Sequence, residues 1–406
     1  TVKDAAQFGR TFNAVQRMIN RGQIMAAHDV SAGGLVTTLL EMTFANTTGG
    51  IEMTTDRFTA DGETDLIKIL FSENPALVIQ VADSKAGTVE SFLEKQGVGF
   101  RFIGTPIEER ALVINHDGSQ HLLGIDYMRD VWFEPSYLMD AVQSGNQCAS
   151  LRFENYKKQP LRYRFLSKYD GSLKTLGLDL SRKERTGIKA AIIREKGVNG
   201  DREMAYSLFL AGFDVKDVHM TDLMSGRETL DDVNMIVFCG GFSNSDVLGS
   251  AKGWAGGFLW NEQAKATLER FYKRPDTLSL GVCNGCQLMI ELNLINPEHG
   301  KRTRMEHNIS HKFESQFVGV TVPKNDSVMF GSLSGTKLGI WVAHGEGRFS
   351  LPESLASYNV IAKYNYTTYP GNPNGSRYSV AGIASADGRH VAIMPHLERA
   401  IFPWQW

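Results

Sequence analysis

The chain has 406 residues, of which 42% are hydrophobic and 22% charged, and its formal net charge is −2. This balance excludes a strongly basic binder of nucleic acid or of a membrane surface, and no apolar run is long enough to span a bilayer. Four cysteines in so long a chain do not build a disulfide framework, so we expect a location in the reducing cytoplasm. The length favours two domains joined by a linker.

Residues 1–150 alternate helices with segments rich in β-forming residues, which predicts one α/β domain. An amphipathic helix is expected from Asp4 to Asn20, immediately after a first residue that is Thr rather than Met. We therefore expect the chain to be a piece of a longer polypeptide. The β-rich segments lie at 35–45, 76–82 and 99–107.

Residues 151–185 are basic and polar without a sustained period, which is typical of a linker, and their aromatic side chains suggest packing on a neighbour. From residue 186 to residue 406 strands and helices alternate at a spacing that predicts a parallel sheet covered on both faces. Strands are expected at 188–195, 213–220, 233–241 and 277–282, helices at 201–213 and 261–274, and a further apolar-rich helix ending near Asn296.

The stretch GVCNGCQLM at 281–289 joins the last of these strands to the apolar-rich helix. A G-x-C-x-G pattern at a strand-to-helix junction is the thiol counterpart of the G-x-S-x-G nucleophile elbow. Gly281 and Gly285 leave room for a strained backbone at Cys283, and the dipole of the following helix favours a thiolate. The N–H of Asn284 would point at an oxyanion formed there. The pattern predicts that Cys283 is a nucleophile.

The spacing of Cys283 and Cys286 also fits a thioredoxin-type redox pair, although such a pair needs no flanking glycines. Zinc requires four ligands, and Cys148 and Cys239 form no second pair at ligand spacing, so metal binding stays unknown. We interpret Cys286 as a small apolar core residue. A thiol redox or sensing module is kept as the alternative hypothesis.

A cysteine nucleophile needs a base and a group that orients this base. The segment RHVAIMPHLERA at 389–400 predicts a strand that leads to His396, with Glu398 two residues further on. Because alternate side chains of an extended segment share one face, Glu398 can reach the far nitrogen of the His396 ring. Glycines at the end of a central strand would provide a second oxyanion donor, the N–H of Gly241 or Phe242.

A Ser- and Gly-rich turn, Ser31 to Gly34, opens a helix in the first domain. It is a plausible anion cradle formed by Ser31, Gly33 and Gly34. An N-cap with a tight turn explains the same residues equally well.

Together the motifs of residues 186–406 resemble the class I, triad-type glutamine amidotransferases, and within that class the glutaminase domain of the phosphoribosylformylglycinamidine synthase family, whose members are large single-chain enzymes. The likeness is specific because several long motifs follow one another in one order. In the first domain, MAAHDVSAGGLVTTLLEMTFA at 25–45 resembles the HDxSDGGL segment of the ATP-dependent, AIR-synthase-like module of the same family. The motifs of the second domain are GVCNGCQLM, GGFSNSDVLGSAKGW, MEHNISHKFESQF, WVAHGEGRF, YPGNPNGS and MPHLERA.

The resemblance implies a flavodoxin-like, doubly wound, mostly parallel sheet, preceded by an α+β or α/β subdomain of the synthetase module. It implies that Cys283 attacks the side-chain amide of glutamine, that His396 transfers the proton and that Glu398 orients the imidazole. Gln287 and His344 are the implied contacts to glutamine. The NPNG stretch at 372–375 is interpreted as a turn first and a ligand contact second.

The whole reaction implied by the resemblance converts formylglycinamide ribonucleotide, ATP and glutamine to formylglycinamidine ribonucleotide, ADP, phosphate and glutamate, a step of de novo purine biosynthesis. ATP and Mg are expected for the full-length enzyme through its upstream module, and no cofactor is expected on the glutaminase domain. Both ends of the chain appear cut relative to the family, so a catalytically silent interaction fragment is a further alternative. The oligomeric state is left open.

Three positions depart from the family pattern. Leu397 occupies a position where Pro is common, which leaves the geometry of the His and Glu pair less fixed. Asn244 and Ser245 occupy positions that are often Tyr-Gly, which affects the oxyanion loop. Ala32 replaces the usual Asp of HDxSDGGL, which argues against a charge-dependent role there.

Overall fold

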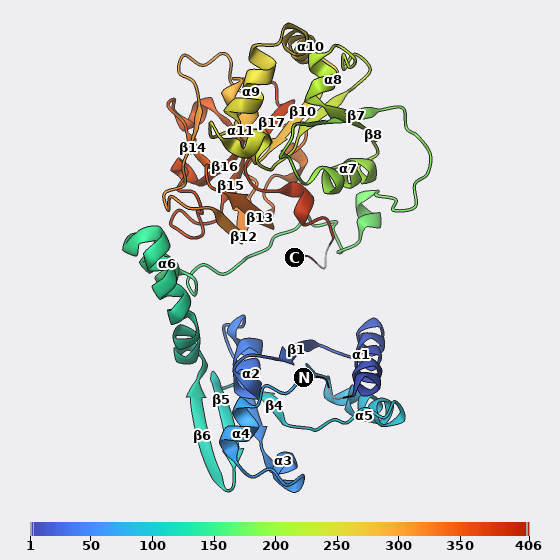
Figure 1. Ribbon diagram of the computed structural model, residues 1–406, viewed down its shortest axis with the longest axis vertical. Coiled ribbons are helices and arrows are strands. Elements are labelled where there is room, and N and C mark those ends of the chain that lie inside the picture. Colours follow the sequence, from blue (N-terminus) through green and yellow to red (C-terminus); the bar gives the residue numbers. More distant parts are fainter. Residues whose placement is uncertain (1, 3, 403–404, 406) are drawn as a thin grey trace. The chain divides into compact units, whose positions relative to one another are not determined.

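The structure is a computed structural model that describes residues 2, 4–402 and 405. The chain forms two compact units, Thr1–Ser136 and Tyr137–Trp406, which Figure 1 colours along the sequence from blue to red. No helix in the described part of the chain combines the length and the apolar character needed to cross a membrane.

The first unit is a mixed α/β unit with two sheets. Its elements in chain order are α1 (Ala5–Asn20), β1 (Ala26–Val30), α2 (Gly34–Phe44), β2 (Gly50–Thr54), α3 (Asp56–Ala60), α4 (Leu66–Phe71), β3 (Ala76–Gln80), α5 (Ala86–Lys95), β4 (Gly104–Ile107), β5 (Ala111–His116) and β6 (Ser119–Gly124). β1 pairs antiparallel with β3, and the larger sheet has the order β4-β2-β5-β6. Only the pair of β2 and β5 in this larger sheet is parallel.

The segment 35–45 is helical, so the expectation of a β-rich segment is wrong there. Leu35, Val36, Leu39 and Leu40 recur at helical spacing and are buried in the core of the first unit. Burial of this face overrides the strand preference of the single β-branched residues. The helix that the preceding Ser- and Gly-rich turn is expected to open is therefore α2.

The second unit is organised around a nine-stranded sheet with the order β13-β12-β15-β16-β17-β10-β9-β7-β8. From β17 to β8 neighbouring strands are parallel, and β16, β15, β12 and β13 extend the sheet with antiparallel pairs. A separate antiparallel pair joins β11 (Arg304–Glu306) to β14 (Arg348–Ser350). The strands of the large sheet are β7 (Lys189–Arg194), β8 (Asp214–His219), β9 (Met235–Phe238), β10 (Leu278–Val282), β12 (Glu314–Thr321), β13 (Lys337–His344), β15 (Asn359–Tyr364), β16 (Val380–Ala384) and β17 (His390–Ile393).

Helices cover both faces of the parallel strands, as the doubly wound fold requires, and this fold class is confirmed. The helices are α7 (Asp201–Leu210), α8 (Met220–Met224), α9 (Lys252–Leu259), α10 (Glu262–Lys273) and α11 (Asn284–Glu291). The connection from β7 to β8 moves toward one edge of the sheet, whereas the connections from β8 to β9 and from β9 to β10 move toward the other edge. Right-handed connections therefore place α7 on one face of the sheet and α8 to α11 on the other. Accordingly α7 packs on β7 and β8, while α8 to α11 contact one another (Figure 1). α11 ends at Glu291, before the expected Asn296, because Asn293 has a φ of 55° that a helix does not accommodate.

The carboxyl ends of the parallel strands meet at one edge of the sheet. The segments that follow β7 and β9 lie side by side there, since Val198 forms an isolated bridge with Gly241. Cys283 follows β10 directly, and His396 follows β17. Open α/β sheets bind ligands at this edge, where the strand order reverses. The fold therefore brings the predicted site residues of the second domain to the same edge.

Helix α6 (Ile125–Asn155) passes from the first unit into the second and is interrupted at Gly145, which has φ 72° and ψ 158°. Residues 151–155 of the expected linker are consequently helical. Further along, Arg164 pairs with Lys337 through two backbone hydrogen bonds of 2.9 Å, so the segment packs on the second unit. The division into domains at residues 150 and 185 stays a prediction.

Candidate active site

Cys283 forms the turn between β10 and α11 and has φ 52° and ψ −108°. A residue other than glycine rarely adopts such a positive φ, so the turn is strained. The N–H of Cys283 donates to Ile393 O at 2.9 Å, which ties the turn to β17. The flanking glycines are required by space, because a Cβ added to Gly281 or Gly285 would lie 2.5 Å from Gly285 O or 2.0 Å from Phe238 O, respectively. This geometry is that of a nucleophile elbow.

His396 and Glu398 form a buried pair, with exposures of 0% and 2%. His396 Nδ1 lies 2.6 Å from Glu398 Oε1, and the backbone N–H of His396 donates to Trp341 O at 2.8 Å. Because a carboxylate accepts, Nδ1 carries a proton, and in the neutral ring Nε2 is the base. Nε2 has no hydrogen-bond partner among the described residues. Leu397 in place of proline thus leaves the close contact between His396 and Glu398 intact.

The thiol and the imidazole lie beside each other at Gly240. A Cβ added to Gly240 would be 2.7 Å from His396 Cε1 and 3.3 Å from Cys283 Cβ, so both groups flank one point of the backbone. The Cys283 thiol is 5% exposed and donates to Ala343 O at 3.4 Å.

The groups around His396 raise its pKa, so the ring is a stronger base than a free imidazole. Burial by itself lowers the pKa of His396, but Cys283 and the Glu398 carboxylate outweigh burial and raise this pKa to about 9. The ring is therefore well suited to hold a proton that a neighbouring thiol gives up.

The expected oxyanion donors lie after β9 and β10. Phe242 donates its N–H to Gly197 O at 2.8 Å, so this N–H is already used. Gly241 has a φ of 121°, and an added Cβ would lie 2.6 Å from Gly197 O, so only glycine fits. Gly241 and Asn284 remain as candidate donors, and the structure gives Phe242 no such role.

The loop after Phe242 is fixed to the elbow by the side chain of Asn284. Its Oδ1 accepts from Ser243 N at 3.1 Å. The two departures in this loop, Asn244 and Ser245, have φ values of 52° and 60°. Asn adopts this region comparatively easily, whereas Ser at a position where the family often has Gly carries strain. The departures therefore change the strain of the loop, while its link to Asn284 is kept.

Gln287 and His344 are both buried, but they differ in what they offer a substrate. Gln287 uses both ends of its amide, because Nε2 donates to Glu346 O at 2.7 Å and Oε1 accepts from Asn284 Nδ2 at 2.8 Å. His344 Nε2 lies 3.2 Å from Asn374 Nδ2, and its Nδ1 has no partner among the described residues. An unpartnered buried polar atom is unfavourable by about 1–3 kcal/mol, which suits a group that waits for a ligand.

Sequence reasoning gave Asn374 no role of its own within the NPNG stretch, but this residue fixes the tautomer of His344. The orientation of its amide is unambiguous, since Oδ1 accepts from Ser376 N at 3.0 Å and Nδ2 donates to Gly347 O at 2.7 Å. Nδ2 therefore faces His344 Nε2, which must accept, and the neutral ring carries its proton on Nδ1. Burial, together with the charge of His396, lowers the pKa of His344 to about 3. The NPNG stretch is the signal that could have found Asn374.

Two carboxylates that sequence reasoning also missed lie close to this edge. Asp246 Oδ1 is 3.4 Å from Asn284 Nδ2, and Glu346 accepts from the Ser250 hydroxyl. Burial raises the pKa of Asp246, and the charge of Glu346 raises it further. A cation placed beside two neighbouring carboxylates would offset the repulsion between their negative charges.

Cys286 is fully buried on α11, and burial, with a contribution from Cys283, raises its pKa far above the ordinary range. A thiol that ionises with such difficulty is a poor partner in thiol–disulfide exchange. Within residues 2, 4–402 and 405, no group of three or more His, Cys, Asp and Glu side chains is arranged to hold a metal ion.

In the first unit, two backbone donors of the turn from Ser31 to Gly34 are in use. Gly33 N donates to Glu73 Oε1 at 2.9 Å, and Gly34 N donates to Ser31 O at 3.0 Å. The turn thus holds a carboxylate of its own chain. Binding of an external anion by Ser31, Gly33 and Gly34 stays a prediction.

Comparison with known families identifies the class of the second unit. Residues 187–406 match the family described as CobB/CobQ-like glutamine amidotransferase domain, and residues 1–117 match AIR synthase related protein, C-terminal domain. Because the first of these matches covers more than half of the chain, the chain belongs to the CobB/CobQ-like glutamine amidotransferase domain family.

Individual relatives align with nearly the whole chain. It is 38% identical over 423 residues to the probable phosphoribosylformylglycinamidine synthase, chloroplastic/mitochondrial, of Arabidopsis thaliana, with 99% of this chain and 29% of that protein aligned. It is 38% identical over 431 residues to phosphoribosylformylglycinamidine synthase of Homo sapiens, with 98% of this chain and 31% of that protein aligned. The chain thus spans less than a third of either relative. Among solved structures, PurLQS from Thermotoga maritima is 28% identical, covers 54% of this chain and 91% of its own, and has a TM-score of 0.45.

Proposed function

We propose that the second unit hydrolyses the side-chain amide of glutamine with Cys283 as nucleophile, His396 as base and acid, and Glu398 as the orienting group. The observation that carries the proposal is the His396 ring, which is held by Glu398 beside the thiol of a strained elbow. Membership in a glutamine amidotransferase family supports the choice of substrate.

The first half of the reaction forms a thioester. His396 Nε2 takes the thiol proton, and Cys283 Sγ attacks the side-chain carbonyl carbon of glutamine. The N–H groups of Gly241 and Asn284 donate to the resulting oxyanion. The C–N bond then breaks, and the imidazolium gives its proton to the departing nitrogen, which leaves as ammonia.

The second half restores the enzyme. Water attacks the thioester carbon while His396 takes one of its protons, and the C–S bond breaks. The imidazolium then returns a proton to the Cys283 sulfur, and glutamate leaves. The sum is glutamine and water converted to glutamate and ammonia, with no net change in the protein.

Charge complementarity supports recognition of a free amino acid. The α-ammonium group of glutamine would relieve the repulsion between Asp246 and Glu346. His344, held as an Nδ1–H donor, would supply a hydrogen bond to an oxygen of the substrate. Gln287 would join this contact only by giving up one of the two hydrogen bonds that it makes.

We propose further that the ammonia serves the ATP-dependent conversion of formylglycinamide ribonucleotide to formylglycinamidine ribonucleotide in a longer protein. The names of the Arabidopsis and human relatives and the match of residues 1–117 support this larger role. ATP and Mg would act in the synthetase part. Since the described residues contain no cluster suited to a metal, we derive no metal-dependent step for this chain. The cytoplasmic location stays a prediction.

A diazoketone analogue of glutamine tests the glutaminase proposal. It should label Cys283 selectively, and Cys283→Ala should lower the labelling rate by at least about 10³-fold. Cys286→Ala is the matched control, since this buried thiol has no role in the mechanism, and it should be labelled at the wild-type rate. Labelling of Cys286, or no labelling of the wild-type protein, would overturn the proposal. Mass spectrometry of the digested protein identifies the modified cysteine.

A further inference from the structure

The second half of α6, residues 137–155, lies outside the amidotransferase match, which begins at residue 187. It nevertheless belongs to the same compact unit as the active site. We propose that this segment is a positioning element of the glutamine site, and that Arg152 and Asp140 act by fixing the loop 308–314. The proposal rests on the glutaminase function proposed above.

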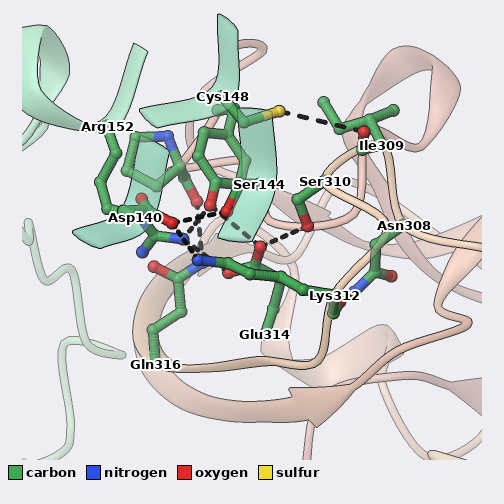
Figure 2. A network of polar contacts seen from close by, with 12 residues as sticks. Asp140, Ser144, Cys148, Arg152, Asn308, Ile309, Ser310, Lys312, Glu314 and Gln316 are labelled. Carbon is green, nitrogen blue, oxygen red and sulfur yellow. Dashed lines mark hydrogen bonds and ion pairs between the residues drawn. The ribbon is translucent and has the colours of Figure 1, made fainter. Parts of the chain in front are cut away.

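The helix and the loop meet in a cluster of four charged side chains (Figure 2). Arg152 bridges two carboxylates, with Nε 3.0 Å from Asp140 Oδ2 and Nη2 2.8 Å from Glu314 Oε2. Lys312 Nζ contacts the other oxygen of Asp140. The side chains of Asp140 and Glu314 are only 9% and 2% exposed. A buried carboxylate that loses its cation is strongly destabilised, so this cluster holds the helix and the loop in one arrangement.

Further hydrogen bonds complete the cluster. Ser144 Oγ donates to Asp140 Oδ1 at 2.5 Å, and Ser310 Oγ donates to Glu314 Oε1 at 2.5 Å. Tyr369 OH also donates to Glu314 Oε1, at 2.9 Å. Such a satisfied, largely buried network is far more specific in its geometry than an ion pair on an exposed surface.

Asn308 connects this loop to the glutamine site. Its Nδ2 donates to Lys312 O at 3.1 Å and to His344 O at 2.7 Å, and its Oδ1 accepts from Gly347 N at 3.0 Å. Asn308 is 0% exposed. One side-chain amide therefore joins the loop that α6 holds to both ends of the 344–347 turn. In addition, Glu314 lies directly opposite His344 in the pairing of β12 with β13.

The 344–347 turn carries His344 and Glu346, two groups proposed to hold glutamine. It does not carry the nucleophile, the base or the group that orients the base. A loosened α6 should consequently misplace the substrate contacts while the chemical groups stay in position. The substrate analogue should therefore bind more weakly, while the limiting rate of Cys283 labelling stays unchanged. A purely structural role would not separate these two quantities.

The test uses the full chain and the diazoketone analogue of glutamine, with the labelling rate of Cys283 measured against reagent concentration. Arg152→Met should raise the half-saturating concentration about tenfold and change the limiting rate by less than about twofold. Arg152→Lys keeps one cation but not the double contact, and should recover part of the affinity. Arg274→Met is the matched control, because Arg274 pairs with Asp276 at a similar side-chain exposure, 26% against 21%, near the amino end of β10.

If Arg152→Met lowers the melting temperature so far that the protein is unfolded, the test uses Lys312→Met instead. This variant keeps the ion pair between Arg152 and the buried Glu314. It should raise the half-saturating concentration about threefold. The proposal is overturned if the binding of the reagent is unchanged in these variants, or if the Arg274 variant shows the same change. A wild-type protein that is not labelled refutes the glutaminase function and this inference with it, whereas a labelled wild type with unaffected variants refutes this inference alone.

Discussion

The two units each contain a tight turn between a strand and a helix, at Ser31–Gly34 and at Cys283. In the first turn the positive φ values, 83° and 72°, fall on Gly33 and Gly34. In the second turn the positive φ falls on Cys283, while glycines occupy the flanking positions. Glycine adopts such a conformation without strain, whereas a residue with a Cβ is unfavourable there by about 1–3 kcal/mol. The second turn thus accepts strain in order to present a side chain.

The two turns also differ in which polar groups they leave unused. Gly33 N is bonded to Glu73, a carboxylate of the same chain. At the second turn, His396 Nε2 has no partner within the described residues. A strand, a tight turn and a helix are therefore not sufficient for a site. Unused groups beside a reactive side chain distinguish the candidate active site from the turn in the first unit.

After the loss of the nucleophile itself, the largest effect is expected from Glu398→Gln, which removes the charge behind the base at the second turn. Because Glu398 contributes to the raised pKa of His396, the substitution should bring this pKa below its value of about 9. The labelling rate of Cys283 by the diazoketone should fall about 10²-fold. In the wild type the rate should decline as the pH rises through about 9 and the imidazolium loses its proton. In the variant this decline should begin at a lower pH.

Asp387→Asn serves as the control for this experiment. Asp387 is near another buried histidine, His390, at the opposite end of β17, and its charge favours protonation of that ring. The Asn variant should keep the labelling rate within about twofold of the wild type. An equal loss in both variants would mean that Glu398 acts through general stability rather than through His396.

An intermediate effect is expected when a Cβ is removed from the second turn or added to the first. Cys283→Gly should be more stable than Cys283→Ala by about 1 kcal/mol, because both lack the sulfur but only Ala keeps the strain. Gly33→Ala should be less stable than the wild type by about 1–3 kcal/mol, because its Cβ meets a positive φ and would lie 2.3 Å from Thr37 Oγ1. Urea denaturation measures both differences. If the Gly and Ala variants of Cys283 are equally stable, the second turn is not strained.

The smallest effect is expected from Glu73→Ala at the first turn. Glu73 is exposed, so the free energy of unfolding should change by less than about 0.5 kcal/mol. The N–H of Gly33 becomes available, and inorganic phosphate should then protect this amide from hydrogen exchange more than it does in the wild type. Glu94→Ala, at another exposed position, should not change the response to phosphate. Equal protection in all three proteins would remove the basis for an anion cradle.

Features set by neighbouring residues could be predicted from the sequence. The start of α1 follows from Asp4, whose side chain accepts from the backbone N–H groups of Ala6 and Gln7. The parallel strands could be found because strands buried on both faces are almost continuously apolar. The pair of His396 and Glu398 was expected from a spacing of two residues in an extended segment, but only His396 is extended in the structure, and Leu397–Arg399 form a short 3-10 helix. This turn still brings the two side chains together.

Features set by distant residues were not accessible. Asn374 orients His344 across 30 positions of sequence, and Asn308 reaches the same region across 36. The NPNG pattern marks Asn374 as a turn residue, but neither amide belongs to a local pattern that specifies its partner. In the same way, the antiparallel strands β12, β13, β15 and β16 acquire their order from pairing between separated segments, for which a single sequence carries no register.

The burial of His344 beside His396 has a consequence for how the site responds to acidity. Since His344 gains a second proton only near pH 3, two adjacent imidazoles never compete for protons under cellular conditions. Mild acidification therefore leaves His344 uncharged, and a bound glutamine would meet this ring with the same hydrogen-bonding character at pH 6 as at pH 8.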